Sequence, residues 1–499
     1  MPTYQNRPGS AQRTVAALNE VFMTIKSDRT TLMRCILISL ILFMAAHAFC
    51  IFNLSLRGES VMLNAEKMNN SFLSAGQFLR PLYLRLRGGI ASPLTIGLIS
   101  FCSLTAACIL LFYLCGMDNL LFYTLLSGLL LFNPAVLEQF AGSLLTADMV
   151  FLSFFLLVAG PALLFIRPGF FPLSALLLFL GLGLSPQLAV TGLCVPLLFW
   201  AAHPEQGPGN NRKPYLLTAA AIAAGAILFA GGVAFFSRRN GIAPEFLFAF
   251  KGQSLKEILM APFTAMFTPA TIYPHFFRIF RSLVPVLAIV LLIKRRNAII
   301  PLVLLCVLLM LPSPGVTGQF SLPVFFLDAM LLLILYQAIR SLSEKKKIVS
   351  ALAAGLYGFF FLGELLFANQ AYLKINLDLD TSLSVMTQVI HRLENREDFI
   401  PGQTQTAFIG SLSRSPLVHE REGFEHLAVM DVLEGETSLQ SQSLTTWFFW
   451  QTLGYPMNCL SDFEQEQLAA SPEVAAMPVF PHPDSIRRIE DTLVVHLSR

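Results

Sequence analysis

Stretches of about 20 apolar residues recur along the first three quarters of this 499-residue chain. A bilayer core about 30 Å thick is crossed by roughly that many residues in a helix. The stretch from Phe170 to Ala202 is too long for one helix and is interrupted at 185–187, so it counts as two short spans. With these two, the sequence predicts eleven membrane helices. The other runs lie at 34–53, 90–115, 119–137, 145–166, 214–236, 276–293, 298–312, 320–339 and 348–368.

The charged residues are few and unevenly distributed. Only 13% of the residues are charged, against roughly 25% in soluble globular domains. Residues 1–373 hold 26 Lys/Arg and 13 Asp/Glu, whereas residues 374–499 hold 8 and 18. The first part lacks the polar residues to cover a water-facing surface, which excludes a soluble enzyme with one large core. Because seven of the eight cysteines lie in or beside apolar runs, a disulfide-built secreted domain is excluded as well.

Lys and Arg placement beside the spans predicts the topology. Cytoplasmic loops carry an excess of these residues, which puts the N-terminal segment 1–33 in the cytoplasm, ahead of the transmembrane domain 34–373. With an odd number of spans, residues 374–499 form an extracytoplasmic domain. The long outer loops are then 54–89 and 237–281.

Both of these outer loops are basic, against the topology bias. Binding of an anion on that face, such as a lipid phosphate, is one explanation. Snorkelling of the side chains to lipid headgroups, or a span count that is off by one, is the other.

The first outer loop contains the residue types needed for group transfer from a lipid-linked phosphate. A carboxylate must accept the proton of the attacking hydroxyl, and cations must hold the departing phosphate. Glu59 and Glu66 are the candidate bases, with a solvated, ion-paired loop carboxylate as the alternative for each. The segment 76–85 is typical of an amphipathic helix at the membrane interface. The candidate phosphate ligands of this loop are Arg57, Arg80, Arg85 and Arg87.

Polar residues in or beside the spans are further candidates, because burying a charge in a membrane is costly. Asp148 and Glu138 flank the second outer loop and are expected to complete a site with the first loop, Asp148 as another candidate base. An ion pair or a cap at a helix end is the alternative for both. Gln187, in the break between the two short spans, is a candidate for bonding a sugar hydroxyl, and satisfaction of the broken backbone is its alternative.

A third group stands at the entry to the span that begins near residue 276. His275, Arg278 and Arg281 share one side of a helix and are predicted to clamp phosphate, with a snorkelling belt as the alternative. The sequence has no metal-spaced Cys/His set and no nucleotide-binding glycine loop. No metal, cofactor or nucleic-acid partner is therefore expected.

The C-terminal residues 374–499 have the pattern of a small α/β domain. Helical spacing covers 381–398, and 405–411 and 492–497 are typical of strands. Ser461 and Glu464 form a capping box for a helix that ends near Ala470.

The layout resembles the multi-span GT-C glycosyltransferases, most closely the bacterial O-antigen glucosyltransferase family of the Gtr type. Three local patterns carry the resemblance. They are the break at Leu184-Ser185-Pro186-Gln187-Leu188-Ala189, the first outer loop with Arg57 and Gly76-Gln77-Phe78-Leu79-Arg80-Pro81-Leu82, and the terminal segment from Met477-Pro478-Val479-Phe480-Pro481 to Thr492-Leu493-Val494-Val495-His496-Leu497.

The resemblance implies transfer of a glucosyl group from a polyprenyl-phosphate donor to a cell-surface glycan such as O-antigen, without an obligatory metal. One position departs from it. Family members usually carry paired aspartates after the first span, where this chain has Asn53-Leu54. Glu59, Glu66 or Asp148 then serves as the base, or the protein is an inactive binding or assembly subunit. A transporter or flippase for lipid-linked glycans is the remaining hypothesis; it predicts repeat symmetry and a polar path across the membrane.

Overall fold

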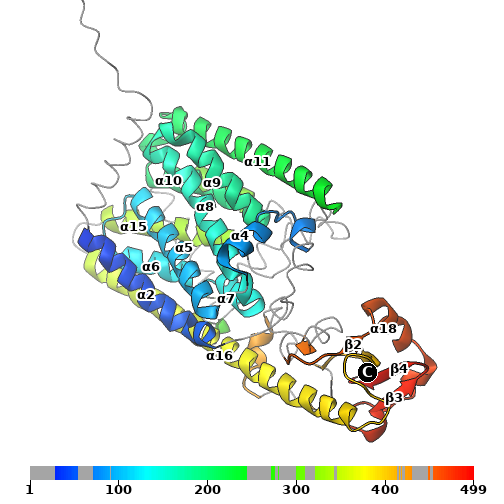
Figure 1. Cartoon of the computed structure of the whole chain (residues 1–499). Helices are drawn as coiled ribbons and strands as arrows, with labels where there is room; N and C mark the ends of the chain where they lie inside the picture. Colours follow the sequence, from blue (N-terminus) through cyan, green and yellow to red (C-terminus); the bar gives the residue numbers. More distant parts are fainter. Residues whose placement is uncertain are drawn as a thin grey trace, which may run out of the picture.

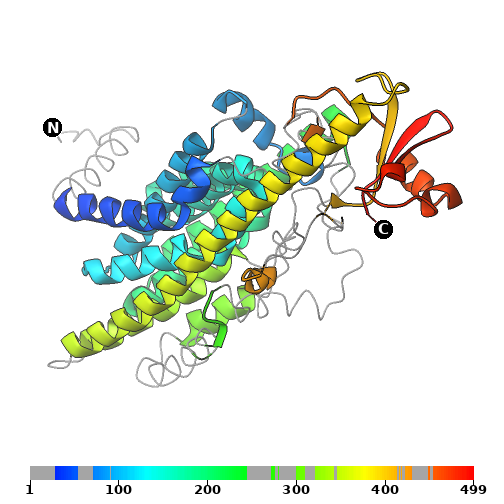
Figure 2. The ribbon, with the colours of Figure 1, turned by 90° about the horizontal axis from the view of Figure 1, so that it is seen from below.

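The computed structural model is a helical bundle from which one long helix leads to a small C-terminal sheet domain (Figures 1 and 2). Three candidate residues of the first loop (Arg57, Glu59 and Glu66), Arg278, Arg281 and the expected span 276–293 lie outside the described residues. The structure describes residues 29–53, 71–89, 92–243, 271–275, 279, 299–309, 321–341, 346–412, 415, 417, 422–429, 448–449 and 453–498.

The α-helices of the bundle follow the apolar runs of the sequence. Their bounds are α2 (Arg29–Phe52), α4 (Arg80–Arg87), α5 (Pro93–Leu114), α6 (Leu120–Leu131), α7 (Pro134–Ser143), α8 (Ala147–Ile166), α9 (Phe171–Leu184), α10 (Val190–Ala202), α11 (Arg212–Asn240), α14 (Ile299–Leu309), α15 (Phe325–Ser341) and α16 (Lys346–Glu394). The short 3-10 turns between them are η2 (Leu144–Thr146), η3 (Pro168–Phe170), η4 (Pro186–Leu188), η5 (Pro204–Gln206) and η8 (Leu322–Val324).

The expected count of eleven spans is not reproduced. Six helical segments in the described residues are long and apolar enough to cross a membrane, judged by length and composition. Three causes separate the counts. The runs 119–137 and 145–166 fall in one continuous helical segment, Leu120–Ile166, and three of the apolar helices, 168–184, 186–202 and 299–309, have fewer than 18 residues. The expected span 276–293 lies, except for residue 279, outside the described residues. The six segments are Arg29–Phe52, Pro93–Leu114, Leu120–Ile166, Arg212–Asn240, Leu322–Arg340 and Ser350–Glu394.

Side chains at the first residues of the helices fix several of these boundaries. Asn119 and Asn133 accept backbone N–H groups of the first turns of α6 and α7, and Ser92 does so for α5. Such caps satisfy donors that have no partner inside the helix. Pro93 and Pro134 follow two of the caps, at the helix position where a missing N–H costs least.

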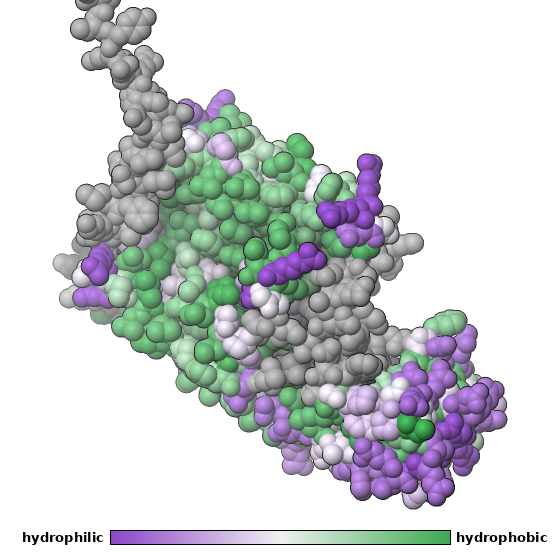
Figure 3. All heavy atoms as spheres, in the orientation of Figure 1, coloured by the Kyte–Doolittle hydropathy of each residue, from purple (hydrophilic) through white to green (hydrophobic). Residues whose placement is uncertain are grey.

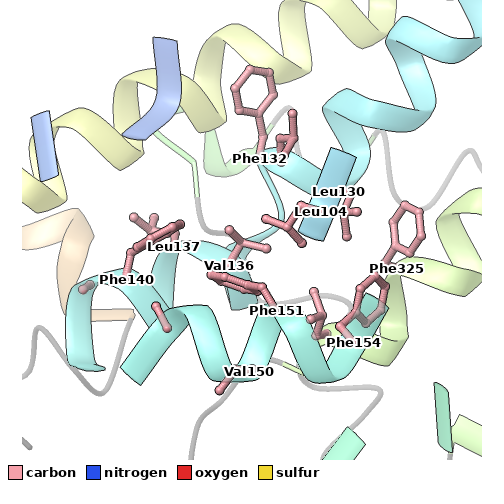
Figure 4. Packing of buried hydrophobic residues seen from close by; sticks show 14 of the residues in the cluster. Leu104, Leu130, Phe132, Val136, Leu137, Phe140, Val150, Phe151, Phe154 and Phe325 are labelled. Carbon is pink, nitrogen blue, oxygen red and sulfur yellow. The ribbon is translucent and has the colours of Figure 1, made fainter. Parts of the chain in front are cut away.

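Aromatic and aliphatic side chains fill the bundle. Figure 4 shows one part of this core, where α7 and α8 meet residues of α5, α6 and α15. The ring of Phe140 packs on that of Phe151 at 5.2 Å between centroids, and Phe154 packs on Phe325 at 6.3 Å. The outer surface of the bundle is apolar too, whereas hydrophilic residues cover most of the C-terminal domain (Figure 3). The described residues therefore form a helical protein suited to a membrane, with a separate polar domain.

A single helix joins the bundle to the C-terminal domain. α16 runs for 49 residues. It continues through position 373, where the transmembrane domain was expected to end, and joins the expected span 348–368 to most of the separate helix expected over 381–398. The segment between residues 364 and 394 contains no glycine or proline that would end it. Figure 2 shows this helix along the whole bundle, with the sheet domain at its far end.

The C-terminal domain is a mixed four-stranded sheet with the order β2-β1-β4-β3. β1 is parallel to β2 and β4, and β3 is antiparallel to β4. β1 and β4 confirm the two predicted strands, and the predicted capping box of Ser461 and Glu464 is present at the start of α18. The bounds are β1 (Gln405–Ile409), η10 (Glu425–Val429), β2 (Asn458–Cys459), α18 (Asp462–Ala469), α19 (Pro472–Ala475), η13 (Pro483–Ser485), β3 (Ile486–Ile489) and β4 (Thr492–His496).

Candidate functional site

The candidate site is built around α4, a helix of eight residues in the last part of the expected outer loop 54–89. Pro81 occupies its first turn, and Gly88, with a φ of 85°, ends it in the left-handed conformation that glycine adopts without strain. Arg80, Tyr83 and Arg87 fall on one face of this helix, and Leu82, Arg85 and Leu86 on the other. The two faces have different surroundings.

At its C-terminal end, α4 is tied to the first turn of α8 by a buried ion pair. Nη1 of Arg87 lies 2.6 Å from Oδ1 and 2.7 Å from Oδ2 of Asp148, whose side chain is fully buried. The Tyr83 hydroxyl donates to Oδ2 of the same carboxylate at 2.8 Å, and Nη2 of Arg87 donates to the Leu145 carbonyl at 3.0 Å. Both carboxylate oxygens therefore have donors.

The position of Asp148 adds to this stabilisation. A negative charge in the first turn of a helix interacts favourably with the helix dipole and with its free N–H groups. Burial, and then the nearby Asp148 charge, raise the pKa of the Tyr83 hydroxyl above its ordinary value, so Tyr83 remains a donor at neutral pH. The geometry is thus the ion pair at a helix end that was the alternative to Asp148 as a base.

At its N-terminal end, α4 and the residues before it are tied to the break between α9 and α10. The Leu79 N–H donates to the Gly183 carbonyl at 3.1 Å, and Nε of Arg80 donates to the Leu184 carbonyl at 2.8 Å. These carbonyls belong to the last turn of α9, where the helix itself supplies no N–H donors for them. The Gln77 amide donates to Oε1 of Gln187 in η4 at 3.3 Å.

Besides Arg87, α4 carries two candidate phosphate ligands, and these are placed differently. Arg80 is buried, and its guanidinium lies over the Phe72 ring at 5.2 Å from the centroid. Arg85 is exposed, between Leu82 and Leu86, which are 52% and 79% exposed. Of the two, only Arg85 is open to a ligand from outside the protein in this structure.

The site lies at the end of the bundle from which α16 leads to the sheet domain. Packed rings connect the start of α8 to α16: Phe151 contacts Phe140, Phe140 contacts His47 at 4.8 Å, and His47 contacts Tyr372 at 6.0 Å. His47 also hydrogen-bonds the Tyr372 hydroxyl at 2.7 Å and the Leu131 carbonyl at 2.8 Å. Figure 1 shows α4 and the sheet domain toward the same end.

The structure brings five of the sequence-predicted residues together. Arg80, Arg85, Arg87, Asp148 and Gln187 all lie on α4 or on segments that contact α4 or the residues before it. Two others lie on different segments. Glu138 is buried on α7, whose Phe140 packs toward α2. His275 is exposed, two residues after Tyr273, whose ring stacks on Phe359 of α16 at 4.9 Å.

The roles of Tyr83, Arg87 and Gln77 toward Asp148 and Gln187 were not recognised in the sequence, although Arg87 was counted as a phosphate ligand. Helical spacing places Arg80, Tyr83 and Arg87 on one face, and this signal separates inward from outward arginines. Within the described part of the chain, no group of three His, Cys, Asp or Glu residues could hold a metal ion.

Comparison with known proteins gives no relatives: no protein-family model, no curated protein and no solved structure matches this chain.

Proposed function

We propose that this protein is an integral membrane glycosyltransferase, which transfers a sugar, in the first place a glucosyl group, from a polyprenyl-phosphate donor to a cell-surface glycan. One observation carries the proposal. Segments far apart in the sequence, namely α4, the first turn of α8 and the α9–α10 break, meet through Arg87, Asp148 and Arg80 at one end of an apolar bundle. A lipid-linked donor has its apolar chain in the bilayer and its polar group at the membrane surface, where the end of such a bundle lies.

The transfer needs one base and one phosphate site. The acceptor hydroxyl gives its proton to a carboxylate and its oxygen forms a bond to the anomeric carbon. The bond from this carbon to the phosphate oxygen breaks, and polyprenyl phosphate leaves with the electron pair. We assign the base to Glu59 or Glu66, because both Asp148 oxygens are engaged by Arg87 and Tyr83. Arg85, exposed on α4, is the first choice for contact with the departing phosphate.

The proposal includes a topology for the inner (plasma) membrane. The N-terminus lies in the cytoplasm, and the end that carries α4 and the C-terminal domain lies on the extracytoplasmic side. Its basis is the placement of Lys and Arg beside the spans. The acidic domain at the end of α16 lies toward the same end of the bundle as α4 (Figure 1), which fits a domain that contacts the glycan acceptor.

Glycan analysis of a strain that lacks the gene tests the function, combined with transfer by the purified protein from polyprenyl-phosphate glucose. We expect the deletion to remove one sugar from a surface glycan, and Glu59→Gln or Glu66→Gln to abolish transfer while leaving thermal stability unchanged. An unchanged glycan in the deletion strain, together with no transfer in vitro, contradicts the proposal.

A second candidate is a catalytically inactive binding or assembly subunit. The observation in its favour is the engagement of Asp148 in an ion pair, together with Asn53 at the place where the resembling family has aspartates. Binding of polyprenyl-phosphate glucose without any turnover, in wild type and in both glutamate variants, supports this candidate over the enzyme.

A further inference from the structure

The break between α9 and α10 contains buried hydroxyl groups without partners. Ser185, at the break, and Thr191, in the first turn of α10, are both fully buried. Among the residues that the structure describes, neither the Oγ of Ser185 nor the Oγ1 of Thr191 has a hydrogen-bond partner. Buried polar groups in native proteins are almost always hydrogen-bonded, so an exception points to a ligand or a second state.

The same break is covered by the segment Gln77–Arg80. Its contacts there are the bonds to the Gly183 carbonyl, the Leu184 carbonyl and the Gln187 amide. These three acceptors belong to residues within two positions of Ser185 in the sequence. A cluster of two carbonyls, two amide side chains and a free hydroxyl can bond a molecule that both donates and accepts.

Aromatic packing holds this segment in place. The Phe78 ring stacks on Phe236 of α11 at 5.4 Å and also contacts Phe179 and Phe229. Gly76 precedes it with a φ of 74°, and the Arg87–Asp148 pair fixes the far end of α4. Opening of this segment has to break the Phe78 ring contacts and to turn the chain at Gly76, while the Arg87–Asp148 pair keeps the C-terminal end of α4 attached.

We propose that the α9–α10 break is a binding site for a hydroxyl-rich group, and that the segment Gln77–Arg80 is a lid that occupies it in the closed conformation seen in the structure. The choice of ligand, the sugar of the lipid-linked donor, rests on the proposed function. When the lid opens, the sugar hydroxyls bond to the Ser185 hydroxyl, the Gly183 and Leu184 carbonyls and the Gln187 amide.

A disulfide across the lid tests the opening step. A Cβ placed on Gly183 lies 2.7 Å from Cγ of Leu79, which is the atom that Sγ replaces in a cysteine. Cysteines at the two positions are therefore close enough to form a disulfide. In the double variant Leu79→Cys/Gly183→Cys, we expect oxidation to abolish binding of polyprenyl-phosphate glucose and a reductant to restore it. The two single variants are the controls. Equal binding by the oxidised and reduced double variant overturns the lid.

Labelling of Ser185→Cys in the full-length protein tests the site without any transfer reaction. Site-resolved mass spectrometry separates this cysteine from the eight native ones. In the protein without the lid disulfide, we expect a maleimide to modify the cysteine at position 185 slowly. Polyprenyl-phosphate glucose should protect this cysteine, whereas polyprenyl phosphate alone should not. Equal protection by both probes assigns the site to the phosphate and overturns a sugar site. No protection by either probe overturns it as well.

A matched pair of variants isolates the hydroxyl. Ser174 on α9 also has a fully buried Oγ without a partner among the described residues, but it lies 11 positions before Ser185. We expect Ser185→Ala to weaken donor binding by between about twofold and about tenfold, as for one neutral hydrogen bond, and Ser174→Ala to leave it unchanged. Equal effects of the two variants contradict the proposal. If the deletion strain has a normal glycan but these results hold, the proposed transfer fails while the binding site stands.

Discussion

Arg87 donates from one guanidinium nitrogen to both oxygens of Asp148, at 2.6 and 2.7 Å, where the side chains are 5% and 0% exposed. Removal of one partner from such a pair leaves the other charge buried without compensation. We expect Asp148→Asn and Arg87→Ala each to lower the free energy of unfolding by about 3–5 kcal/mol. Thermal unfolding of the purified protein in detergent or nanodiscs measures the loss.

The double variant Asp148→Asn/Arg87→Ala controls this experiment, because it removes both charges together. Its loss should be clearly smaller than the sum of the single losses, since residues in direct contact are energetically coupled. Additive losses would mean that the two residues act independently, contrary to their direct contact in the structure.

The two other arginines of α4 should separate binding from stability. Arg80 is buried and bonded to the Leu184 carbonyl, whereas Arg85 is exposed. We expect Arg80→Ala to destabilise the protein by at least about 1 kcal/mol. Arg85→Ala should change stability by less than about 0.5 kcal/mol while it weakens binding of a polyprenyl-phosphate lipid. Lipid binding and thermal unfolding, measured on the same preparations, check the two expectations. If both variants bind the lipid as tightly as the wild type, Arg85 is not part of the phosphate site.

The sequence predicted the helical character and the meeting of the first loop with Asp148, but not the contact of that loop with Gln187. Glu138, which was expected at the same site, lies on a different segment. Burying a charge in an apolar run is costly, and the membrane part has few polar residues, so these residues are expected to contact one another. It did not predict which residues of α4 point inward, although helical spacing carries that information for Arg80 and Arg85. The partner of Asp148 required the three-dimensional packing of α4 on α8.

The span count differed mainly because the apolar runs do not map one to one onto helices. Asn133 and Pro134 start α7 directly after α6, so the runs 119–137 and 145–166 belong to one continuous helical segment, Leu120–Ile166. Similarly, no residue pattern marks the end of the membrane part of α16, because the helix continues through Lys374 and Asp378, which form an ion pair at 3.1 Å with little exposure. The strands β2 and β3 were missed because they have two and four residues, and β3 carries Arg487 and Arg488 at its exposed positions.

The hydrogen bond between His47 and Tyr372 should contribute modestly. It joins α2 to α16 at 2.7 Å inside the bundle, and side-chain hydrogen bonds between membrane helices contribute about 0.6 kcal/mol on average. We expect Tyr372→Phe to lower the free energy of unfolding by about 1 kcal/mol, much less than Asp148→Asn. Thermal unfolding under identical conditions compares the two variants. A loss for Tyr372→Phe as large as that for Asp148→Asn would show that the ion pair has no special weight in this bundle.

Asp398 in the C-terminal domain should make the stability of that domain depend on pH. The hydrogen bond from Arg396 is the main reason that the pKa of its carboxyl lies well below the ordinary value. Burial opposes this effect, and the hydrogen bond from Arg488 adds to it. Nε of Arg396 and of Arg488 lie 2.8 and 3.0 Å from the two carboxylate oxygens. Because the pKa is lower in the folded state, the stabilisation is complete above the unfolded value of about 3.9 and is lost as the pH falls below it.

Hydrogen–deuterium exchange of the full-length protein measures this effect in peptides that cover β1 and β4. At pH 7 we expect Asp398→Asn to destabilise the domain by about 1 kcal/mol, a small value because the carboxylate is one-third exposed and solvent screens it. The difference from wild type should shrink as the pH falls from about 5 to about 3, after correction for the intrinsic exchange rate. Asp484→Asn is the control, since Asp484 is 67% exposed and lies 3.8 Å from the His482 ring. A difference for Asp398→Asn that stays constant over this range would show that its charge does not stabilise the domain.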